Sequence, residues 1–291
     1  MPESRLRIAK SDIVKAFESL SEKILRRSDI NGVMEKNREF WRLRRAMSLD
    51  EFIRFLLEDT KLEEVSLDFP NRKITRYVWD KAPLYELLMT LDANCYFSHY
   101  SAMFFHGLTV QVPKTVYVNH EQLGKSRGEG ALTQERIDSA MERAPRVSKN
   151  YTDYQNRRIY LLNGKHTANL GVVEMEGPGG EMIRVSDVER TLIDAAVRPV
   201  YAGGVFEVLN AYKLACSKVS VNKLAATLKK LDYIYPYHQV VGFYLEKAGV
   251  YKESSIALLR KSDFKYDFYL MHQIKEKAYS EKWRLYFPKG F

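Results

Sequence analysis

The chain has 291 residues, of which 45% are hydrophobic and 29% are charged, so it is long enough for two domains and apolar enough for a buried core. No apolar run approaches the ~20 residues of a membrane-spanning helix, the N-terminus MPESRLRIAK contains no apolar signal segment, and Cys95 and Cys216 have no metal-type spacing; these features predict a cytoplasmic protein without membrane contact. The net charge of +9 favours a polyanionic partner, because Lys and Arg side chains that neutralise phosphates release counterions.

Residues 1–82 are predicted to form three helices followed by a hairpin. Ser11 precedes the first helix, and a second helix is expected after Ser28. The third helix has the sequence LDEFIRFLLED, with Ser48 as its N-cap and Glu51 completing a capping box. Two alternating strands, 63–69 and 73–79, then flank the turn signal PNR. This order is typical of a winged helix-turn-helix, in which the third helix enters the major groove of DNA and the hairpin is the wing.

The predicted DNA-contacting side chains lie on the third helix, in the segment before it and on the hairpin. Arg54 is the expected base reader, because the other exposed positions of the third helix are acidic. Cationic side chains near the helix and at the hairpin tip are expected to contact phosphates. The full predicted set is Arg42, Arg44, Arg45, Ser48, Arg54, Arg72, Lys73 and Arg76. The alternative is a small helical domain whose hairpin never meets DNA.

Residues 83–291 are predicted to form a second domain, mixed α/β over 83–185 and mostly helical over 186–291. The sequence therefore indicates an α+β protein. The glycine-rich basic stretch GKSRGEG, residues 124–130, is expected to be a mobile surface loop. Basic charge is concentrated at the two ends of the chain: residues 5–45 hold 12 Lys and Arg against 6 Asp and Glu, and residues 213–291 hold 15 against 7. The basic C-terminal segment, which also contains many tyrosines, leaves a second nucleic-acid surface open.

The stretch SDVERTLIDAAVRPVYAGG, residues 186–204, is dense enough in charge to suggest an active site. Ser186 and Glu189 fit a capping box, and opposite charges at Asp187, Arg190, Asp194 and Arg198 are spaced to pair along one side of a helix. In this interpretation the polar residues cap and stabilise the helix and have no catalytic role. The alternative is a metal-dependent nuclease that uses Asp187, Glu189 and Asp194. His99 and His106 are too far apart for the usual zinc spacing on a helix. No catalytic residue, metal or cofactor is expected.

Two long phrases resemble the AbiEi family of antitoxins from type IV toxin–antitoxin systems. They are YFSHYSAMFFHGLTVQVPKTVYVNHEQ, residues 96–122, and VSDVERTLIDAAVRPVYAGGVFEVLNAY, residues 185–212. The similarity continues through YIYPYHQVVGFYLEKAG, residues 233–249, and the terminal WRLYFPKG, residues 283–290. It therefore extends over most of residues 77–291.

The resemblance implies a non-enzymatic protein of phage defence and plasmid maintenance. Members of this family repress their own operon through an N-terminal winged helix bound to double-stranded DNA, at operators expected to be inverted repeats that two copies would bind. Their C-terminal domain counteracts a nucleotidyltransferase-like toxin, AbiEii, without a stable complex. The alternatives are a solitary transcriptional regulator without a toxin partner, the nuclease described above, and a pure protein-interaction module.

Overall fold

The computed structural model describes residues 5–122, 124, 131–261 and 263–291. The chain divides into two compact units, Met1–Leu91 and Asp92–Phe291. Both contain helices and sheets, so the predicted α+β class is confirmed. Of the basic stretch at 124–130, all but Gly124 lies outside the described residues. Among the helices of the described ranges, none has the length and apolar character needed to cross a membrane.

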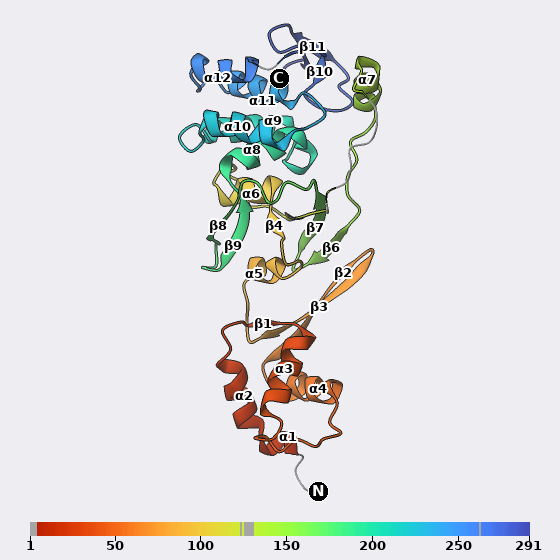
Figure 1. Cartoon of the computed structure of the whole chain (residues 1–291), viewed down its shortest axis with the longest axis vertical. Coiled ribbons are helices and arrows are strands. Elements are labelled where there is room, and N and C mark those ends of the chain that lie inside the picture. Colours follow the sequence, from red (N-terminus) through yellow and green to blue (C-terminus); the bar gives the residue numbers. More distant parts are fainter. Residues whose placement is uncertain (1–4, 123, 125–130, 262) are drawn as a thin grey trace. The chain divides into compact units, whose positions relative to one another are not determined.

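The first unit consists of short helices and a three-stranded antiparallel sheet (Figure 1). Its strands β1 and β2 flank β3, and β2 and β3 form the predicted hairpin. The pairing runs from Leu62 opposite Trp79 to Phe69 opposite Arg72, so the turn lies at the predicted PNR signal. The elements are α1 (Arg5–Ile8), α2 (Lys10–Glu18), β1 (Ile24–Leu25), α3 (Arg27–Asn37), α4 (Leu49–Asp59), β2 (Leu62–Phe69), β3 (Arg72–Trp79) and α5 (Leu84–Met89).

Aromatic side chains join the helices of the first unit to its sheet. The rings of Phe17 on α2 and Trp79 on β3 are stacked with their centroids 4.9 Å apart. Phe52 on α4 is fully buried and packs against Trp41, at a centroid distance of 5.9 Å. The apolar face of α4 therefore points into this core, which leaves its polar face outward, as the helical spacing of its apolar residues predicts.

The boundary between the units falls after Leu91, later in the chain than the predicted boundary after residue 82. The contacts of Arg76 on β3 explain the difference. Its Nε donates to Thr90 Oγ1 at 3.0 Å, and its guanidinium also donates to the Thr90 carbonyl. These bonds attach the end of α5 to the hairpin, so α5 belongs to the first unit.

The second unit contains a six-stranded mixed sheet in the order β6-β7-β5-β4-β9-β8. Its central pairs are non-local: β5 runs parallel to β7, and β4 runs parallel to β9. Helix α6 packs against both β5 and α8. The elements up to the end of this sheet are β4 (Tyr96–Phe97), α6 (His99–Phe105), β5 (Thr115–Glu121), α7 (Gln134–Glu142), β6 (Tyr151–Tyr154), β7 (Arg157–Gly164), β8 (Val172–Glu176) and β9 (Met182–Ser186).

The remainder of the second unit is mostly helical, as predicted, but it ends in a small three-stranded sheet ordered β10-β12-β11. Helix α11 carries Gly242 against Trp283, which precedes β12; a Cβ atom at Gly242 would lie 2.1 Å from the indole. Only glycine allows this approach. The elements are α8 (Val188–Val197), a 3₁₀ turn (Pro199–Tyr201), α9 (Val205–Leu214), α10 (Val221–Leu231), α11 (Tyr237–Ala248), α12 (Glu253–Arg260), β10 (Phe268–Tyr269), β11 (Lys277–Ser280) and β12 (Leu285–Pro288).

Candidate nucleic-acid interface

The loop between α3 and α4 is organised by Arg38. Its Nη1 donates to the Arg44 carbonyl at 2.8 Å, and its Nη2 lies 3.4 Å from the Met47 carbonyl oxygen. The same guanidinium is paired with Glu35 of α3, with Nε 2.8 Å from Oε2 and Nη2 2.6 Å from Oε1. Because one side chain fixes both the helix end and the loop carbonyls, the loop has a defined course over a buried anchor, Trp41.

This loop carries three exposed arginines, and two of them have no side-chain partner among the described residues. Arg42 and Arg45 are exposed and form no hydrogen bond or ion pair with any side chain in the described part of the chain. Arg42 also has a φ of 52°, in the left-handed region that non-glycine residues rarely adopt. Arg44 is exposed but pairs with Glu51 of α4, its Nη2 lying 2.5 Å from Oε1.

The acidity of the outer face of α4 is partly neutralised by arginines from outside the helix. Asp50 pairs with Arg27 of α3, at 2.6 Å between Oδ1 and Nη2, and Glu51 pairs with Arg44. The pairing with Asp50 raises the pKa of Arg27. Glu58 and Arg54 remain exposed at the surface of the helix. The negative charge at the outer face of α4 is therefore smaller than the sequence of the helix alone indicates.

Ser48 is confirmed as the N-cap of α4, since its hydroxyl accepts a hydrogen bond from the Glu51 amide at 3.1 Å. The predicted capping box is not completed. Glu51 pairs with Arg44, and no side-chain bond returns from it to the backbone of Ser48 among the described residues. The hydroxyl of Ser48 thus has a structural partner, and its predicted place near DNA depends on its position at the start of α4.

The hairpin divides the predicted phosphate contacts into two groups. Arg72 and Lys73 are exposed beside the turn, opposite Phe69 and Asp68. Arg76 is half-buried and bonded to Thr90, as described above, so the phosphate contact at Arg76 stays a prediction and would have to compete with these bonds. Strand alternation indicates an outward side chain at this position, but it cannot show the bonds to Thr90.

Sequence reasoning missed three basic residues of the same unit. Arg38 fixes the loop, and Arg26 and Arg27 are exposed at the start of α3. The signals were present in the sequence: an acid and a base three residues apart at Glu35 and Arg38, and an adjacent basic pair directly before a helix.

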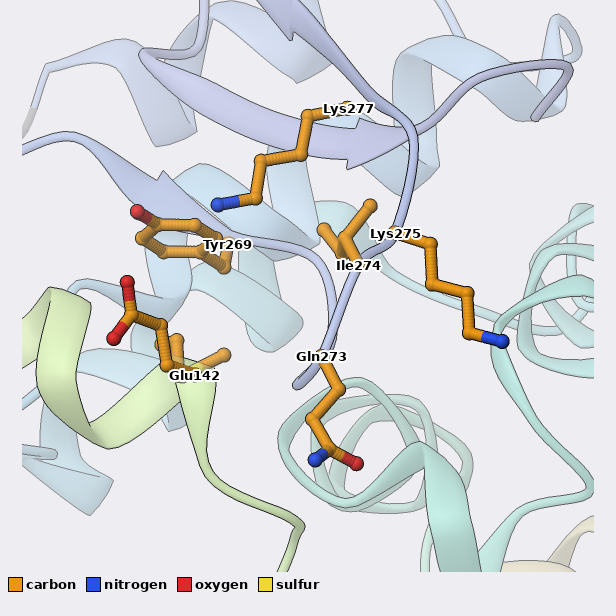
Figure 2. Close-up of a pocket in the computed structure, with 7 residues that line it drawn as sticks. Glu142, Tyr269, Gln273, Ile274, Lys275 and Lys277 are labelled. Atoms are coloured by element: carbon orange, nitrogen blue, oxygen red, sulfur yellow. The ribbon is translucent and has the colours of Figure 1, made fainter.

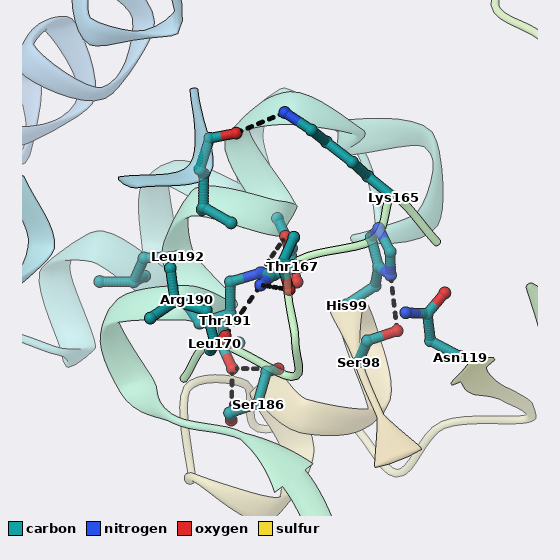
Figure 3. Close-up of polar contacts among 12 residues, drawn as sticks. Ser98, His99, Asn119, Lys165, Thr167, Leu170, Ser186, Arg190, Thr191 and Leu192 are labelled. Carbon is teal, nitrogen blue, oxygen red and sulfur yellow. Dashed lines mark hydrogen bonds and ion pairs between the residues drawn. The ribbon is translucent and has the colours of Figure 1, made fainter. Parts of the chain in front are cut away.

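The second candidate site, around α8, is a buried polar network (Figure 3). The N-cap of α8 is Asp187, whose carboxylate accepts a hydrogen bond from the Arg190 amide at 2.8 Å. The predicted cap at Ser186 is therefore wrong. Ser186 is fully buried, its hydroxyl lies 2.9 Å from Thr191 Oγ1, and its carbonyl oxygen lies 2.6 Å from His106 Nε2.

Arg190 and Asp194 form a buried ion pair one helical turn apart. The Nε of Arg190 donates to Asp194 Oδ1 at 2.8 Å, and the two side chains are 5% and 8% exposed. The other arm of Arg190 donates to the Leu170 carbonyl at 2.9 Å and lies 3.3 Å from Thr167 Oγ1 (Figure 3). Burial is the largest single influence and would lower the pKa of Arg190, but the charge and hydrogen bond of Asp194, together with the nearby Tyr96 and Tyr233, outweigh it and the net pKa is raised.

The remaining carboxylates of α8 have a different partner. Asp187 Oδ2 and Glu189 Oε2 each lie 2.9 Å from the ammonium of Lys223 on α10. Glu189 also accepts a hydrogen bond from the Ser220 amide at 2.8 Å. Burial opposes ionisation of Glu189, but these bonds hold its pKa below the usual value.

The predicted charge pairing along α8 is therefore partly right. The bond between Arg190 and Asp194 lies along the helix, whereas Asp187 and Glu189 reach another helix, and Arg198 is exposed and donates to the Arg146 carbonyl at 3.2 Å. The three carboxylates of the nuclease alternative are thus directed at two separate cations. Within the described residues, no group of three or more His, Cys, Asp or Glu side chains is placed to hold a metal ion.

His99 and His106 also have separate partners. Nδ1 of His99 lies 2.8 Å from Ser98 Oγ, whereas His106 meets the Ser186 carbonyl. Burial lowers the pKa of His99 to about 4, with Asp194 opposing the shift, so this imidazole is neutral at physiological pH.

A cavity of about 400 Å³ lies between α7 and the C-terminal sheet (Figure 2). The ammonium of Lys277 lies over the ring of Tyr269, 5.1 Å from its centroid. Lys275 extends away from Lys277, as Figure 2 shows, and Glu142 brings a negative charge to the Tyr269 side. The charged groups do not converge on one point, so the cavity has no set of side chains that would orient an ionic ligand.

The comparisons with known proteins give the fold alone. No family model matches the chain, and no curated protein matches it. Among solved structures, the chain is similar to the RV2827C protein from Mycobacterium tuberculosis, with a TM-score of 0.60 and 14% sequence identity. The match covers 96% of this chain and 90% of that protein, so both units have counterparts in one known architecture.

Proposed function

We propose that the first unit is a winged helix-turn-helix that binds double-stranded DNA, and that the chain is a transcriptional repressor and antitoxin of the AbiEi type. The observation that carries the proposal is the loop fixed by Arg38. It places the uncommitted Arg42 and Arg45 directly before α4, in a unit where a hairpin follows that helix. Helix, preceding loop and hairpin are the three parts with which winged helices contact DNA.

In this proposal α4 lies in the major groove and Arg54 contacts base edges. Arg42 and Arg45 neutralise phosphates on one side of the groove, and Arg72 and Lys73 do so through the hairpin. Arg44 contributes only when its exposed pair with Glu51 opens. Such a pair contributes ~0–1 kcal/mol, so a phosphate can displace it. Two copies of the chain would occupy an inverted-repeat operator.

The antitoxin role is proposed for the second unit, on the family resemblance. The two longest matching phrases, residues 96–122 and 185–212, contain β4, α6 and β5 in one case and α8 and α9 in the other. These segments are neighbours, because β4 pairs with β9 and α6 packs on α8. The segments that resemble the AbiEi family thus lie together in the structure, which supports the proposal that this unit is a domain of that family. The functional partner would be a nucleotidyltransferase-like toxin.

The DNA-binding part is tested by titrating the full chain with duplex DNA from upstream of its own gene. Arg42→Gln/Arg45→Gln should weaken binding and reduce the dependence of log Kd on log salt by about 1.8, at ~0.9 per phosphate contact. The matched control is Lys229→Gln/Lys230→Gln, which removes the same charge from the exposed end of α10. Equal effects of the two variants would contradict an interface at the loop.

The antitoxin part needs a separate readout. The genes next to this one are first searched for one that encodes a nucleotidyltransferase-like protein, and growth is then measured when the two are co-expressed. Rescue of growth by both wild type and Arg42→Gln/Arg45→Gln would separate neutralisation from DNA binding. Absence of rescue, with DNA binding intact, would favour the solitary regulator.

A further inference from the structure

Three tyrosines lie side by side across neighbouring strands of the large sheet. Tyr151 on β6 is in register with Tyr160 on β7, and Tyr160 is in register with Tyr117 on β5. Their ring centroids are separated by 5.3 Å between Tyr151 and Tyr160 and by 5.4 Å between Tyr160 and Tyr117. Residues in register project from the same face, so the three rings form one aromatic row.

The row is closed at one end and open at the other. Tyr117 is covered by Tyr201, at a centroid distance of 5.4 Å, and the His99 ring lies 6.2 Å from it. Tyr151 and Tyr160 are half-buried, and Tyr151 lies on β6, the edge strand of the sheet. The ring of Tyr201 also lies 6.3 Å from the middle ring, Tyr160, so the ring of Tyr151 and part of the ring of Tyr160 are accessible at the edge.

One cationic side chain lies over the ring at the open end, and further cations are close to it in the sequence. The guanidinium carbon of Arg158 lies 4.3 Å from the centroid of the Tyr151 ring. Arg158 also pairs with Asp153, at 3.0 Å between Nε and Oδ1, and Asp153 is the sole acid in residues 143–158. The same stretch has five basic residues: Arg143, Arg146, Lys149, Arg157 and Arg158.

The segment that leads into β6 has a fixed course beside the aromatic row. The Ser148 amide donates to the Tyr201 hydroxyl at 2.7 Å, and Asn150 Nδ2 donates to the Leu161 carbonyl at 2.8 Å. The side chains of Arg146 and Lys149 are exposed on this segment. The backbone that carries Arg146 and Lys149 is therefore held beside Tyr201, whose ring contacts those of Tyr117 and Tyr160.

We propose that this surface, defined by Tyr151, Tyr160, Arg158, Arg146 and Lys149, binds single-stranded nucleic acid. Aromatic rings on neighbouring strands stack unpaired bases, and the flanking cations neutralise the backbone phosphates. A duplex does not fit this chemistry, because its bases are already stacked on one another. The surface lies in the second unit and is independent of the duplex-binding interface proposed for the first.

The test uses the full chain and two labelled unstructured oligonucleotides of ~12 residues, oligouridylate RNA and oligothymidylate DNA, in fluorescence anisotropy. Tyr151→Thr places another residue that favours strands at this position but removes the ring. It should weaken binding at least about fivefold, the lower bound for one lost base–aromatic stack of ~1 kcal/mol. Tyr151→Phe retains the ring and should stay within about twofold of wild type.

Charge is tested separately, with exposed residues whose substitution leaves the fold intact. Arg146→Gln/Lys149→Gln should reduce the salt slope by about 1.4, at ~0.7 per phosphate of a single strand. Lys229→Gln/Lys230→Gln removes equal charge elsewhere and should leave the slope unchanged. Arg42→Gln/Arg45→Gln should also leave single-strand binding unchanged, which separates this proposal from duplex binding by the first unit.

Binding of either oligonucleotide with these responses supports the proposal, and the tighter of the two arms shows whether RNA or DNA is preferred. Four results would overturn it: no binding of either oligonucleotide, equal affinity for a duplex competitor in the Arg42→Gln/Arg45→Gln background, equal weakening by Tyr151→Thr and Tyr151→Phe, or full displacement by oligoglutamate of matched charge. The last result would assign the surface to an acidic peptide.

Discussion

Asp194→Asn tests whether the charged residues of α8 stabilise the fold or form a catalytic site. Asp194 is 8% exposed and Arg190 is 5% exposed, so the variant leaves the guanidinium of Arg190 buried beside a neutral amide. Removal of one partner from a buried pair costs ~3–5 kcal/mol. Arg190 keeps its bond to the Leu170 carbonyl, and Asn can still accept from Nε, so the lower end, about 3 kcal/mol, is expected.

The loss is measured by thermal unfolding. For a unit of this size, ~1 kcal/mol shifts Tm by roughly 2–4 °C, so Asp194→Asn should lower Tm by about 6–12 °C. The double variant Arg190→Met/Asp194→Leu removes both charges and should recover at least half of the loss, because no buried charge remains unpaired. A Tm for Asp194→Asn within about 1 °C of wild type, combined with loss of a metal-dependent DNA cleavage, would refute this reasoning and support the nuclease.

Three further predictions follow from single side chains. Arg38→Gln should weaken duplex binding with little change in Tm, because it releases the loop that carries Arg42 and Arg45; unchanged affinity would show that the loop needs no fixation. Between pH ~6.5 and ~4 the imidazole of His99 takes up a proton in the unfolded wild type but not in the folded one, because burial lowers its pKa to about 4 in the folded state. The free energy of unfolding of wild type should therefore fall by about 3 kcal/mol as the pH falls through this range. His99→Asn should remove this part of the pH dependence. In denaturant titrations, an equal pH dependence in the two proteins would be the contrary result. Gly242→Ala should lower Tm, although Gly→Ala stabilises an open helix by ~1 kcal/mol, because its Cβ would lie 2.1 Å from the Trp283 ring; a raised Tm would mean that the indole moves aside easily.

The three longer helices and the hairpin of the first unit were predictable because their signals are local, whereas α1 and β1 were not predicted. Ser48 caps α4, and the strand alternation gives the hairpin with its turn in the predicted place. These features depend on neighbours within a few residues. The pairing of β4 with β9 brings together residues almost ninety positions apart, and no short pattern in the sequence indicates it.

The side-chain differences from the predictions have the same origin. Ser186 and Asp187 are both good N-caps, and the choice depends on Thr191 and His106, which bury Ser186. Arg76 is outward by alternation, but its guanidinium is bonded to Thr90, the residue that follows α5.

The basic stretch at 143–158 was missed for a different reason. Over a long segment, its five cations are offset by acids such as Glu174 and Glu176 of β8, so the net charge of the segment does not show the cluster. A shorter window would have found the cluster, but only the register of β5, β6 and β7 shows that the tyrosines form a row.

The central proposal is duplex DNA binding by the first unit, and the salt dependence of binding to the upstream region of the gene tests it most directly. Wild type should bind this DNA more tightly than a scrambled duplex, with a log Kd that varies linearly with log salt, and Arg42→Gln/Arg45→Gln should lower that slope by about 1.8. Equal affinity for both duplexes, or a slope that is the same in the variant and in wild type, would contradict it.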